Sequence, residues 1–493
     1  MPVLKLWQND TCREIFFEGE TALKDLLRQR GCWTDHPCGG RGSCGKCAVR
    51  AAGGLCLPTE AEQKAGCRLS CQLKLRADAE VWLPDGVDNR IELSGSLPVL
   101  GNAMGSGAGA AVDVGTTTLA LKLYDLQTGA LMAECGMLNP QRSIAADVMG
   151  RIGAAMAGQL SELQEMAVGA VKTLLQTACG RAGISAEQVD FLVVTGNTTM
   201  LYLLTGRNPS CLSAAPFRAD CLFGKKDTLL GLPVYYPPCL DAFVGADITC
   251  AVLDSGMDLQ EKTSLLCDIG TNGEIVLWKD GTLYITSTAA GPAFEGAGIS
   301  CGCGSIPGAI DRVWVEDGKI RVHTVGEKPA VGLCGSGLVD AVAAFLQTGD
   351  IDETGAVEEV FLPLSEFVRL LPADIRAVQL AKGAIAAGVR TLLEQAGITE
   401  EQIDVFYIAG GFGSHLNVAS AAAIGLIPEK LAPRSRILGN AALSGAAGLL
   451  LDRARTERAE QLRERIISVN LGGNSRFNNF FMEAMLFGGD LWE

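Results

Sequence analysis

The chain contains an internal duplication that spans most of its length and restricts the folds open to it. Residues 113–131 read DVGTTTLALKLYDLQTGAL and residues 268–283 read DIGTNGEIVLWKDGTL, each a D-x-G-T turn that leads into alternating strands. A second repeat contains AGISAEQVD within residues 171–197 and AGITEEQID within residues 389–411, between a helix and a buried strand. Because both pairs occur in the same order, we predict two homologous lobes.

Composition and charge narrow the class of protein. The 493 residues are 48% hydrophobic and 20% charged, which is enough apolar material for several domain cores. The formal charge of -15 argues against a nucleic-acid backbone as the main partner. Residues 1–20 carry charges throughout, and the longest uncharged run, residues 93–112, is rich in glycine and serine. We therefore expect a cytoplasmic protein with neither a nucleic-acid nor a membrane partner.

Each D-x-G-T turn offers the groups that bind phosphate. Backbone amides and hydroxyl groups in such a turn can donate to phosphate oxygens, and the aspartates can hold Mg²⁺ through water. We predict Asp113 and Asp268 as the catalytic residues, with simple turn formation as the alternative. The residues expected to bind the nucleotide phosphates are Gly115, Thr116, Thr117, Thr118, Gly270, Thr271, Asn272 and Gly273.

Two lobes that each open with this turn resemble the superfamily of sugar kinases, Hsp70 and actin, which are two-lobed α/β ATPases with duplicated ribonuclease-H-like lobes. The resemblance implies that AGGFGSH, residues 409–415, contacts the adenosine of ATP, and that TGNTTM (195–200) and GNAALSGA (439–446) lie at the hinge. The glycines expected to let the backbone approach the nucleoside are Gly410, Gly411 and Gly413.

Three further carboxylates are weaker candidates. Glu274 and Glu295 could orient the attacking water, or they could be ordinary surface or capping carboxylates. Asp147, in SIAADVMGR, has no assignable role and could equally lie on a helix face.

The N-terminal region contains a cysteine loop with metal-ligand spacing. Cys38, Cys44 and Cys47 follow the pattern C-x5-C-x2-C among glycines that permit tight turns around a cluster. This spacing resembles that of ferredoxins with a two-iron, two-sulfur (2Fe-2S) cluster, which take a fourth cysteine downstream. We prefer Cys71 over Cys67 as the fourth ligand, because RLSCQ resembles the end of that ferredoxin loop. A zinc site and plain thiols are the alternatives.

A second group of cysteines lies in the C-terminal half. Cys301 and Cys303, in GISCGCGSIPG, could join Cys334 or Cys267 in a further metal site. Buried thiols in glycine-rich turns are the commoner case.

These features predict five regions. They are a β-grasp ferredoxin domain of α+β class (1–86), a flexible linker (87–108), ATPase lobe I (109–256), ATPase lobe II (257–453), and a C-terminal strand and amphipathic helix (454–493). We expect the last region to pack back on the first lobe, or to carry a dimer contact.

The motifs together resemble the reductive activators of corrinoid-dependent enzymes. The resemblance rests on CGGRGSCGKC, DVGTTT, LNPQRSIAADVMGRI, FVGADIT, CDIGTNGEI, AAGPAFEGAGISCG, LCGSGLVDAV and AGGFGSHLN. It implies a homodimeric ATPase that uses ATP, Mg²⁺ and a 2Fe-2S cluster to return a corrinoid protein or corrinoid-dependent methyltransferase from cobalt(II) to cobalt(I). A low-potential electron donor would refill the cluster. Longer members place a middle domain between the ferredoxin and the ATPase, and here only the linker separates them.

Three rival functions remain open from the sequence. The activators of 2-hydroxyacyl-CoA dehydratases hold a four-iron cluster between two subunits, and the N-terminal cysteines argue against that class. A redox-regulated small-molecule kinase would need an acceptor-binding motif. An adaptor with an inert ATPase fold would show no turnover.

Overall fold

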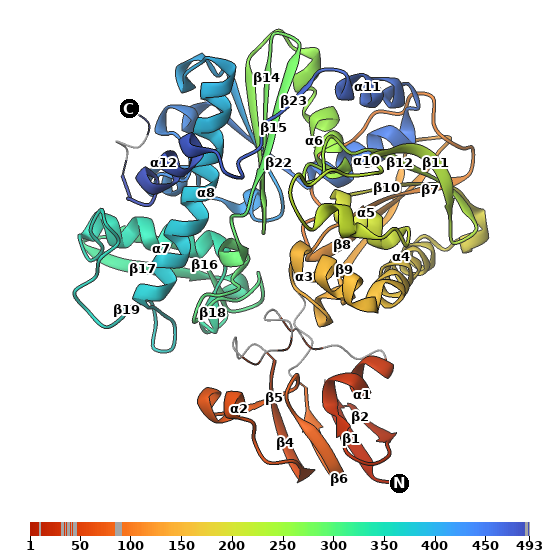
Figure 1. Ribbon diagram of the computed structural model, residues 1–493, viewed down its shortest axis with the longest axis vertical. Coiled ribbons are helices and arrows are strands. Elements are labelled where there is room, and N and C mark those ends of the chain that lie inside the picture. Colours follow the sequence, from red (N-terminus) through yellow and green to blue (C-terminus); the bar gives the residue numbers. More distant parts are fainter. Residues whose placement is uncertain are drawn as a thin grey trace. The chain divides into compact units, whose positions relative to one another are not determined.

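The computed structural model describes residues 1–8, 11–30, 34, 36, 40, 42, 47–83, 91–488 and 492, and Figure 1 shows its helices and strands. The chain divides into two compact units. One contains residues 1–88, 138–170 and 202–214, and the other contains residues 89–137, 171–201 and 215–493. The first unit includes the cysteine loop, and the second includes both D-x-G-T turns.

The N-terminal residues form a mixed sheet with the strand order β2-β1-β6-β4-β5, and β3 pairs with β6. The elements are β1 (Val3–Gln8), β2 (Thr11–Phe16), β3 (Thr21–Ala22), α1 (Leu23–Gln29), β4 (Ala48–Leu55), α2 (Glu60–Ala65), β5 (Arg68–Leu69) and β6 (Lys74–Trp82). Strands β1 and β6 are parallel, whereas β1–β2 and β4–β6 are antiparallel. Leu4 and Leu6 alternate onto one face and pack with Leu23 and Leu27 of α1. This is the predicted β-grasp arrangement.

Two further sheets contain most of the remaining strands, in the orders β11-β12-β10-β7-β8-β9 and β22-β21-β13-β14-β15-β23. The first consists of β7 (Ala108–Val114), β8 (Thr118–Asp125), β9 (Leu131–Leu138), β10 (Val189–Gly196), β11 (Phe223–Leu229) and β12 (Leu232–Pro238). The second consists of β13 (Ser264–Ile269), β14 (Gly273–Lys279), β15 (Thr282–Thr288), β21 (Val405–Ala409), β22 (Ser435–Gly439) and β23 (Ile466–Ser468).

The two sheets repeat one topology. Strand β7 pairs antiparallel with β8 and parallel with β10, as β13 pairs with β14 and β21. The helices α4 (Leu160–Ala182) and α8 (Pro372–Ala396) precede β10 and β21, and a capping box follows each helix, at Ser185 and Thr399. The predicted duplication into two α/β lobes is therefore confirmed.

Helices α6 (Ala246–Ser255) and α10 (Ala441–Leu451) pack against each other where the two lobes meet. They approach closely at Gly445, where an added Cβ would stand 2.0 Å from the carbonyl oxygen of Cys250. Their apolar side chains share one core with residues of both sheets, such as Val193 and Leu266. Lobes I and II are therefore joined by a continuous hydrophobic core.

The connection between the third strand and the long helix differs between the lobes. In lobe I it consists of η1 (Pro140–Ser143), α3 (Val148–Ala154) and the π-helical η2 (Ala155–Gln159); α5 (Thr198–Leu204) and η4 (Pro209–Leu212) follow β10. In lobe II it consists of η6 (Pro292–Glu295), β16 (Ala309–Glu316), β17 (Lys319–Thr324), β18 (Gly332–Leu333), α7 (Gly335–Thr348), β19 (Leu362–Pro363) and β20 (Arg369–Leu370).

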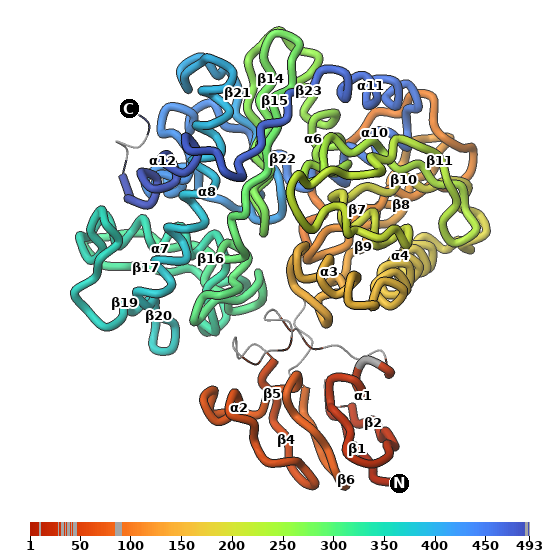
Figure 2. The backbone as a smooth tube through the Cα atoms, in the orientation of Figure 1, coloured from red at the N-terminus to blue at the C-terminus, as the bar shows by residue number. Residues whose placement is uncertain are grey.

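The C-terminal region corrects one prediction, because its strand and last helix pack on lobe II rather than on lobe I. Helix α11 (Ala454–Arg463) contacts α6 and β12 of lobe I. Strand β23 then pairs in parallel with β15, and Figures 1 and 2 show the two strands side by side. Helix α12 (Ser475–Glu483) lies on α8, where Arg390 donates to Glu483 at 2.7 Å. The physical reason is that β23 covers a sheet edge at β15 that would otherwise be open.

Residues 91–107, which we name the strap, fall within the predicted flexible linker but are fixed along α10. Asn440 N donates to the Ser94 carbonyl at 2.9 Å, and Gly101 N donates to the Leu451 carbonyl at 3.0 Å. The expectation of flexibility is therefore wrong for the strap, because backbone hydrogen bonds and the partly buried Leu93 hold it in place. Residues 87–90 of the predicted linker lie outside the described residues.

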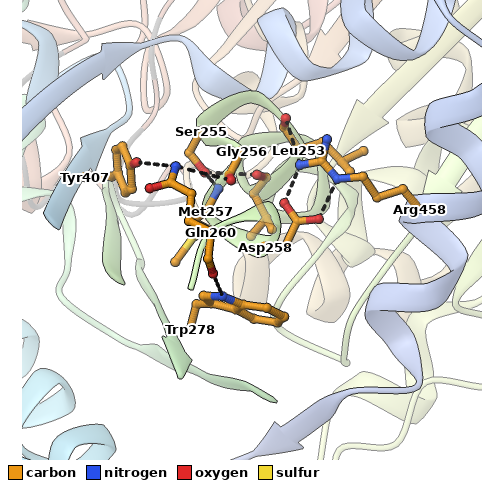
Figure 3. Close-up of polar contacts among 10 residues, drawn as sticks. Leu253, Ser255, Gly256, Met257, Asp258, Gln260, Trp278, Tyr407 and Arg458 are labelled. Carbon is orange, nitrogen blue, oxygen red and sulfur yellow. Dashed lines mark hydrogen bonds and ion pairs between the residues drawn. The ribbon is translucent and has the colours of Figure 1, made fainter. Parts of the chain in front are cut away.

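The chain crosses from lobe I to lobe II at a turn after α6, which Figure 3 shows in detail. The carboxylate of Asp258 pairs there with the guanidinium of Arg458 on α11. Gln260 donates from Nε2 to the Tyr407 hydroxyl at 3.4 Å, and its carbonyl oxygen accepts from Trp278 Nε1 at 2.9 Å. The crossing is therefore attached to α11 on one side and to strands β14 and β21 on the other.

Candidate functional site

The first predicted catalytic residue, Asp113, lies near the end of β7, where the chain reverses into β8. Asn440 Nδ2, at the start of α10, donates to Asp113 Oδ2 at 3.2 Å. Burial raises the pKa of Asp113 to about 7; the hydrogen bond from Asn440 opposes this rise and the charge of Asp268 adds to it. A bound cation would relieve the unfavourable burial of negative charge here.

Asp268 occupies the equivalent place near the end of β13. Burial raises the pKa of Asp268 to about 6. Glu274 stands opposite Asp268 in the β13–β14 pair, and burial raises its pKa well above the ordinary value, with the charges of Asp247 and Asp268 adding to the effect. Glu274 therefore belongs to an acidic cluster with Asp268.

Asp247 completes the acidic cluster and is not among the predicted site residues. It lies in the first turn of α6, within FVGADIT. Burial raises the pKa of Asp247 to about 8, and the charges of Asp268 and Asp113 contribute. The signal in the sequence is ambiguous, because an acidic residue in a first helical turn is usually explained by the helix dipole.

The hydroxyl groups of the two turns converge on one side chain. Thr117 Oγ1 donates to Glu295 Oε2 at 2.7 Å, and Thr271 Oγ1 donates to Glu295 Oε1 at 2.6 Å. Asn197 Nδ2 donates to Thr116 Oγ1 at 2.9 Å. The D-x-G-T turns therefore face each other on two sides of one site.

The remaining predicted phosphate-binding residues form the backbone of the same turns. Gly115 lies so close to the carbonyl of Thr118 that an added Cβ would stand 2.6 Å from its oxygen. Gly270 N donates to the carbonyl of Asn272 at 3.0 Å, and Gly273 begins β14. Both turns are thus tight, as the pattern predicts.

The glycine-rich segment after β21 approaches Asp268 closely. Gly410 has a φ of 91°, and an added Cβ would stand 2.5 Å from Asp268 Oδ1. The aromatic ring of Phe412, between Gly411 and Gly413, stacks on Phe294 with 4.9 Å between the ring centroids. Only glycine at position 410 leaves room for this carboxylate, so the segment and the acidic cluster belong to one site.

Two of the four predicted cluster ligands lie within the described residues, and they meet. Cys47 Sγ and Cys71 Sγ are 3.3 Å apart and buried, while Cys38 and Cys44 lie outside the described residues. Ser70 N donates to the Cys47 carbonyl at 2.8 Å, which holds the two ligand segments together. Two thiols at this distance fit ligands of one metal centre. Cys67 packs beside them, only partly buried.

The other candidates take structural positions. Asp147 caps α3 by accepting from Gly150 N at 2.8 Å. Within the described ranges, no group of three or more side chains is placed to coordinate a metal ion directly, so Cys301 and Cys303 do not form a second metal site there. No helix in the part of the chain that the structure describes is both long and apolar enough to cross a membrane.

Comparisons with known proteins agree with this architecture. Residues 108–260 match the family described as the RACo middle region, and residues 262–491 match the C-terminal domain of RACo, the ASKHA domain. The expectation that a middle domain is missing is therefore wrong, because lobe I itself matches the middle region. The chain is similar over its full length to the solved structure of a reductive activator for corrinoid, iron-sulfur protein, with 26% identity, a TM-score of 0.71 and coverage of 100% of this chain and 99% of the other.

Two curated relatives are also similar. One is the corrinoid activation enzyme RamQ of Eubacterium limosum, 33% identical over 418 residues, which cover 77% of this chain and 70% of the relative. The other is the Co(II) methylated amine-specific corrinoid protein reductase of Methanosarcina barkeri, 26% identical over 417 residues and 76% of each chain. This chain belongs to the family of corrinoid activation enzymes.

Proposed function

We propose that this chain delivers one electron to the inactive cobalt(II) of a corrinoid protein, restores cobalt(I), and couples the delivery to ATP. One observation carries the proposal. A single chain joins paired cysteine sulfurs in a β-grasp domain to a two-sided site of carboxylates and hydroxyl groups. The names of the relatives support reduction of a corrinoid partner.

The redox centre is a 2Fe-2S cluster held by Cys38, Cys44, Cys47 and Cys71. The 3.3 Å separation of the Cys47 and Cys71 sulfurs fits such a centre. When bound, a cluster of this class supplies single electrons at a potential of about −400 mV. Leu69 is buried beside the two thiols and keeps water from them on that side.

The nucleotide site lies between the D-x-G-T turns. Asp113, Asp268 and Asp247 would hold Mg²⁺ through bound water, and burial raises the pKa of each of these acids, which a nearby cation would offset. The hydroxyl groups of Thr116, Thr117 and Thr271, with Asn272, would hold the phosphates. The adenosine would lie against the backbone of Gly410, Gly411 and Gly413.

ATP contributes through a difference in affinity between two arrangements of the lobes. A nucleotide can shift a protein's conformation only as far as it prefers one arrangement over the other. We infer that nucleotide binding moves the lobes and separates the activator from its partner after reduction. A homodimer and a low-potential electron donor complete the system.

The test is an anaerobic reduction assay under argon. The reduced, cluster-loaded protein is mixed with a cobalt(II) corrinoid protein, with and without MgATP, and the cobalt(I) absorption band is followed. A methyltransferase corrinoid protein, an O-demethylase corrinoid protein and free cobalt(II) cobalamin serve as alternative acceptors. We expect cobalt(I) with one corrinoid protein and only with MgATP. Equal yields without nucleotide would contradict the proposal.

A further inference from the structure

Glu295 lies between the two D-x-G-T turns and binds a hydroxyl group from each. Its two carboxylate oxygens accept from Thr117 of lobe I at 2.7 Å and from Thr271 of lobe II at 2.6 Å. From the sequence, Glu295 is expected either to orient the attacking water or to be an ordinary surface or capping carboxylate. The geometry instead shows one anion at the point where the donors of both turns converge.

The main chain around Glu295 is fixed. Glu295 ends η6, and Gly296 follows with a φ of 74°. Phe294 is buried and stacks on Phe412 of the glycine-rich segment, with an angle of 10° between the rings. On the other side, an added Cβ at Gly296 would stand 2.4 Å from the carbonyl oxygen of Cys303. The carboxylate is therefore presented to the turns by a rigid support, and only its side chain is free to move.

Hydroxyl groups cannot serve a carboxylate and a phosphate at once. A threonine hydroxyl has one hydrogen to donate. Thr117 and Thr271 already donate to Glu295, and both belong to the turns assigned to the nucleotide phosphates. A phosphate oxygen is an anionic acceptor like a carboxylate oxygen and competes for the same two donors.

We propose that Glu295 is a placeholder for phosphate: its carboxylate joins the two turns in the nucleotide-free protein, and the phosphate of MgADP or MgATP displaces it. This inference rests on the proposed nucleotide site. It makes Glu295 a positioning residue that opposes nucleotide binding, and not a general base. Displacement gives both threonines a shared new partner and frees the side chain of Glu295 from both lobes.

The test compares nucleotide affinities by isothermal titration calorimetry on the full-length, cluster-loaded protein. MgADP and the magnesium complex of AMPPNP are titrated into wild type, Glu295→Gln and Glu295→Ala. The matched control is Glu358→Gln, which removes one negative charge at an exposed position. We expect both Glu295 variants to bind each nucleotide roughly tenfold more tightly, the effect of losing about one charge-assisted hydrogen bond that competes with the ligand. The control should bind like wild type.

The measured nucleotide affinities distinguish the placeholder role of Glu295 from other roles of this residue. The inference is overturned if Glu295→Gln binds nucleotide as wild type does or more weakly while keeping the melting temperature of wild type. It is also overturned if the variant loses only kcat for ATP hydrolysis, with nucleotide affinity unchanged. Thr271→Val provides a second arm: we expect it to weaken MgADP binding, because the phosphate loses a donor. If wild type and all variants bind neither nucleotide, the proposed nucleotide site itself is wrong.

Discussion

Lobe I and lobe II begin with the same hairpin, yet different residues occupy equivalent places in the two lobes. In lobe I, Asp113 stands opposite Ala120 in the β7–β8 register, whereas in lobe II, Asp268 stands opposite Glu274. For helices α6 and α10, the extra acidic residue belongs instead to lobe I. Helix α6 follows the N-cap Gly245 and has Asp247 in its first turn, whereas α10 has Asn440 as its N-cap and no acidic residue in its first turn.

The difference shows how a duplicated fold builds one asymmetric site. The shared topology places two tight turns face to face, and the diverged side chains divide the chemistry between them. Lobe I supplies an acid from its helix, lobe II supplies an acid from its hairpin, and Asn440 of lobe II donates to Asp113 of lobe I. Each lobe therefore needs the other to complete its half of the site.

The largest effect is expected from the paired aspartates. We expect Asp268→Asn and Asp113→Asn each to lower ATP turnover by about 10²–10³-fold, because each removes a charge that would hold Mg²⁺. Steady-state phosphate release measures the effect. If one substitution left turnover unchanged, the site would depend on a single lobe.

The turn where the chain crosses from lobe I to lobe II gives the next largest effect. We expect Asp258→Asn to lower the free energy of unfolding by about 3 kcal/mol, because it leaves the largely buried Arg458 without its carboxylate. Denaturant unfolding measures the loss. The exposed pair Arg321–Glu316 is the control, and Glu316→Gln should cost less than about 0.5 kcal/mol. Equal losses would mean that the Asp258–Arg458 pair stabilises the fold no more than an exposed ion pair does.

Asn440 and Asn197 compare the two lobes directly. Each side chain caps a helical turn, accepting from Leu443 N at 2.8 Å or from Met200 N at 2.9 Å, so Ala at either position should cost about 1 kcal/mol. The hydrogen bond from Asn440 also lowers the pKa of Asp113.

The two variants should therefore differ in their pH–rate profiles. We expect Asn440→Ala to move the acidic limb to higher pH and Asn197→Ala to leave it in place. Identical profiles would argue against a role for the Asn440–Asp113 contact in turnover.

The smallest effect is expected in the pH dependence of thermal stability, through Asp247. Because the pKa of Asp247 is raised to about 8 in the folded protein, against about 3.9 for an unfolded aspartate, folding takes up a proton between these values. The stabilising contribution of this group is full below pH 4 and is lost as the pH rises through 8. Asp247→Asn cannot titrate.

In the absence of Mg²⁺, the Tm of Asp247→Asn minus that of wild type should therefore increase by about 2–4 °C between pH 5 and pH 8. Scanning calorimetry measures this difference, with Glu358→Gln as the exposed control. A difference that stays constant across this range would place the charge of Asp247 outside the cluster.

Features with local sequence signals were predictable, and those made by distant contacts were not. The two hairpins and the glycine turn follow from short motifs, because tight turns impose their residues. Asp247 lies in a first helical turn, where acidic residues are common, so its sequence position did not mark it as a site residue. Glu295 meets Thr117 across 178 positions of sequence, which no local pattern encodes. The strap looked flexible from its glycines and serines, but its hydrogen bonds to α10 depend on tertiary packing.

One experiment tests the coupling of ATP hydrolysis to cobalt reduction most directly. Cobalt(I) absorbance and released phosphate are recorded together in one anaerobic reaction for wild type, Asp268→Asn and Cys71→Ser. We expect both signals to rise together in wild type, both to be absent in Asp268→Asn, and phosphate alone to appear in Cys71→Ser. Full cobalt(I) formation by Asp268→Asn or by Cys71→Ser would contradict the coupling.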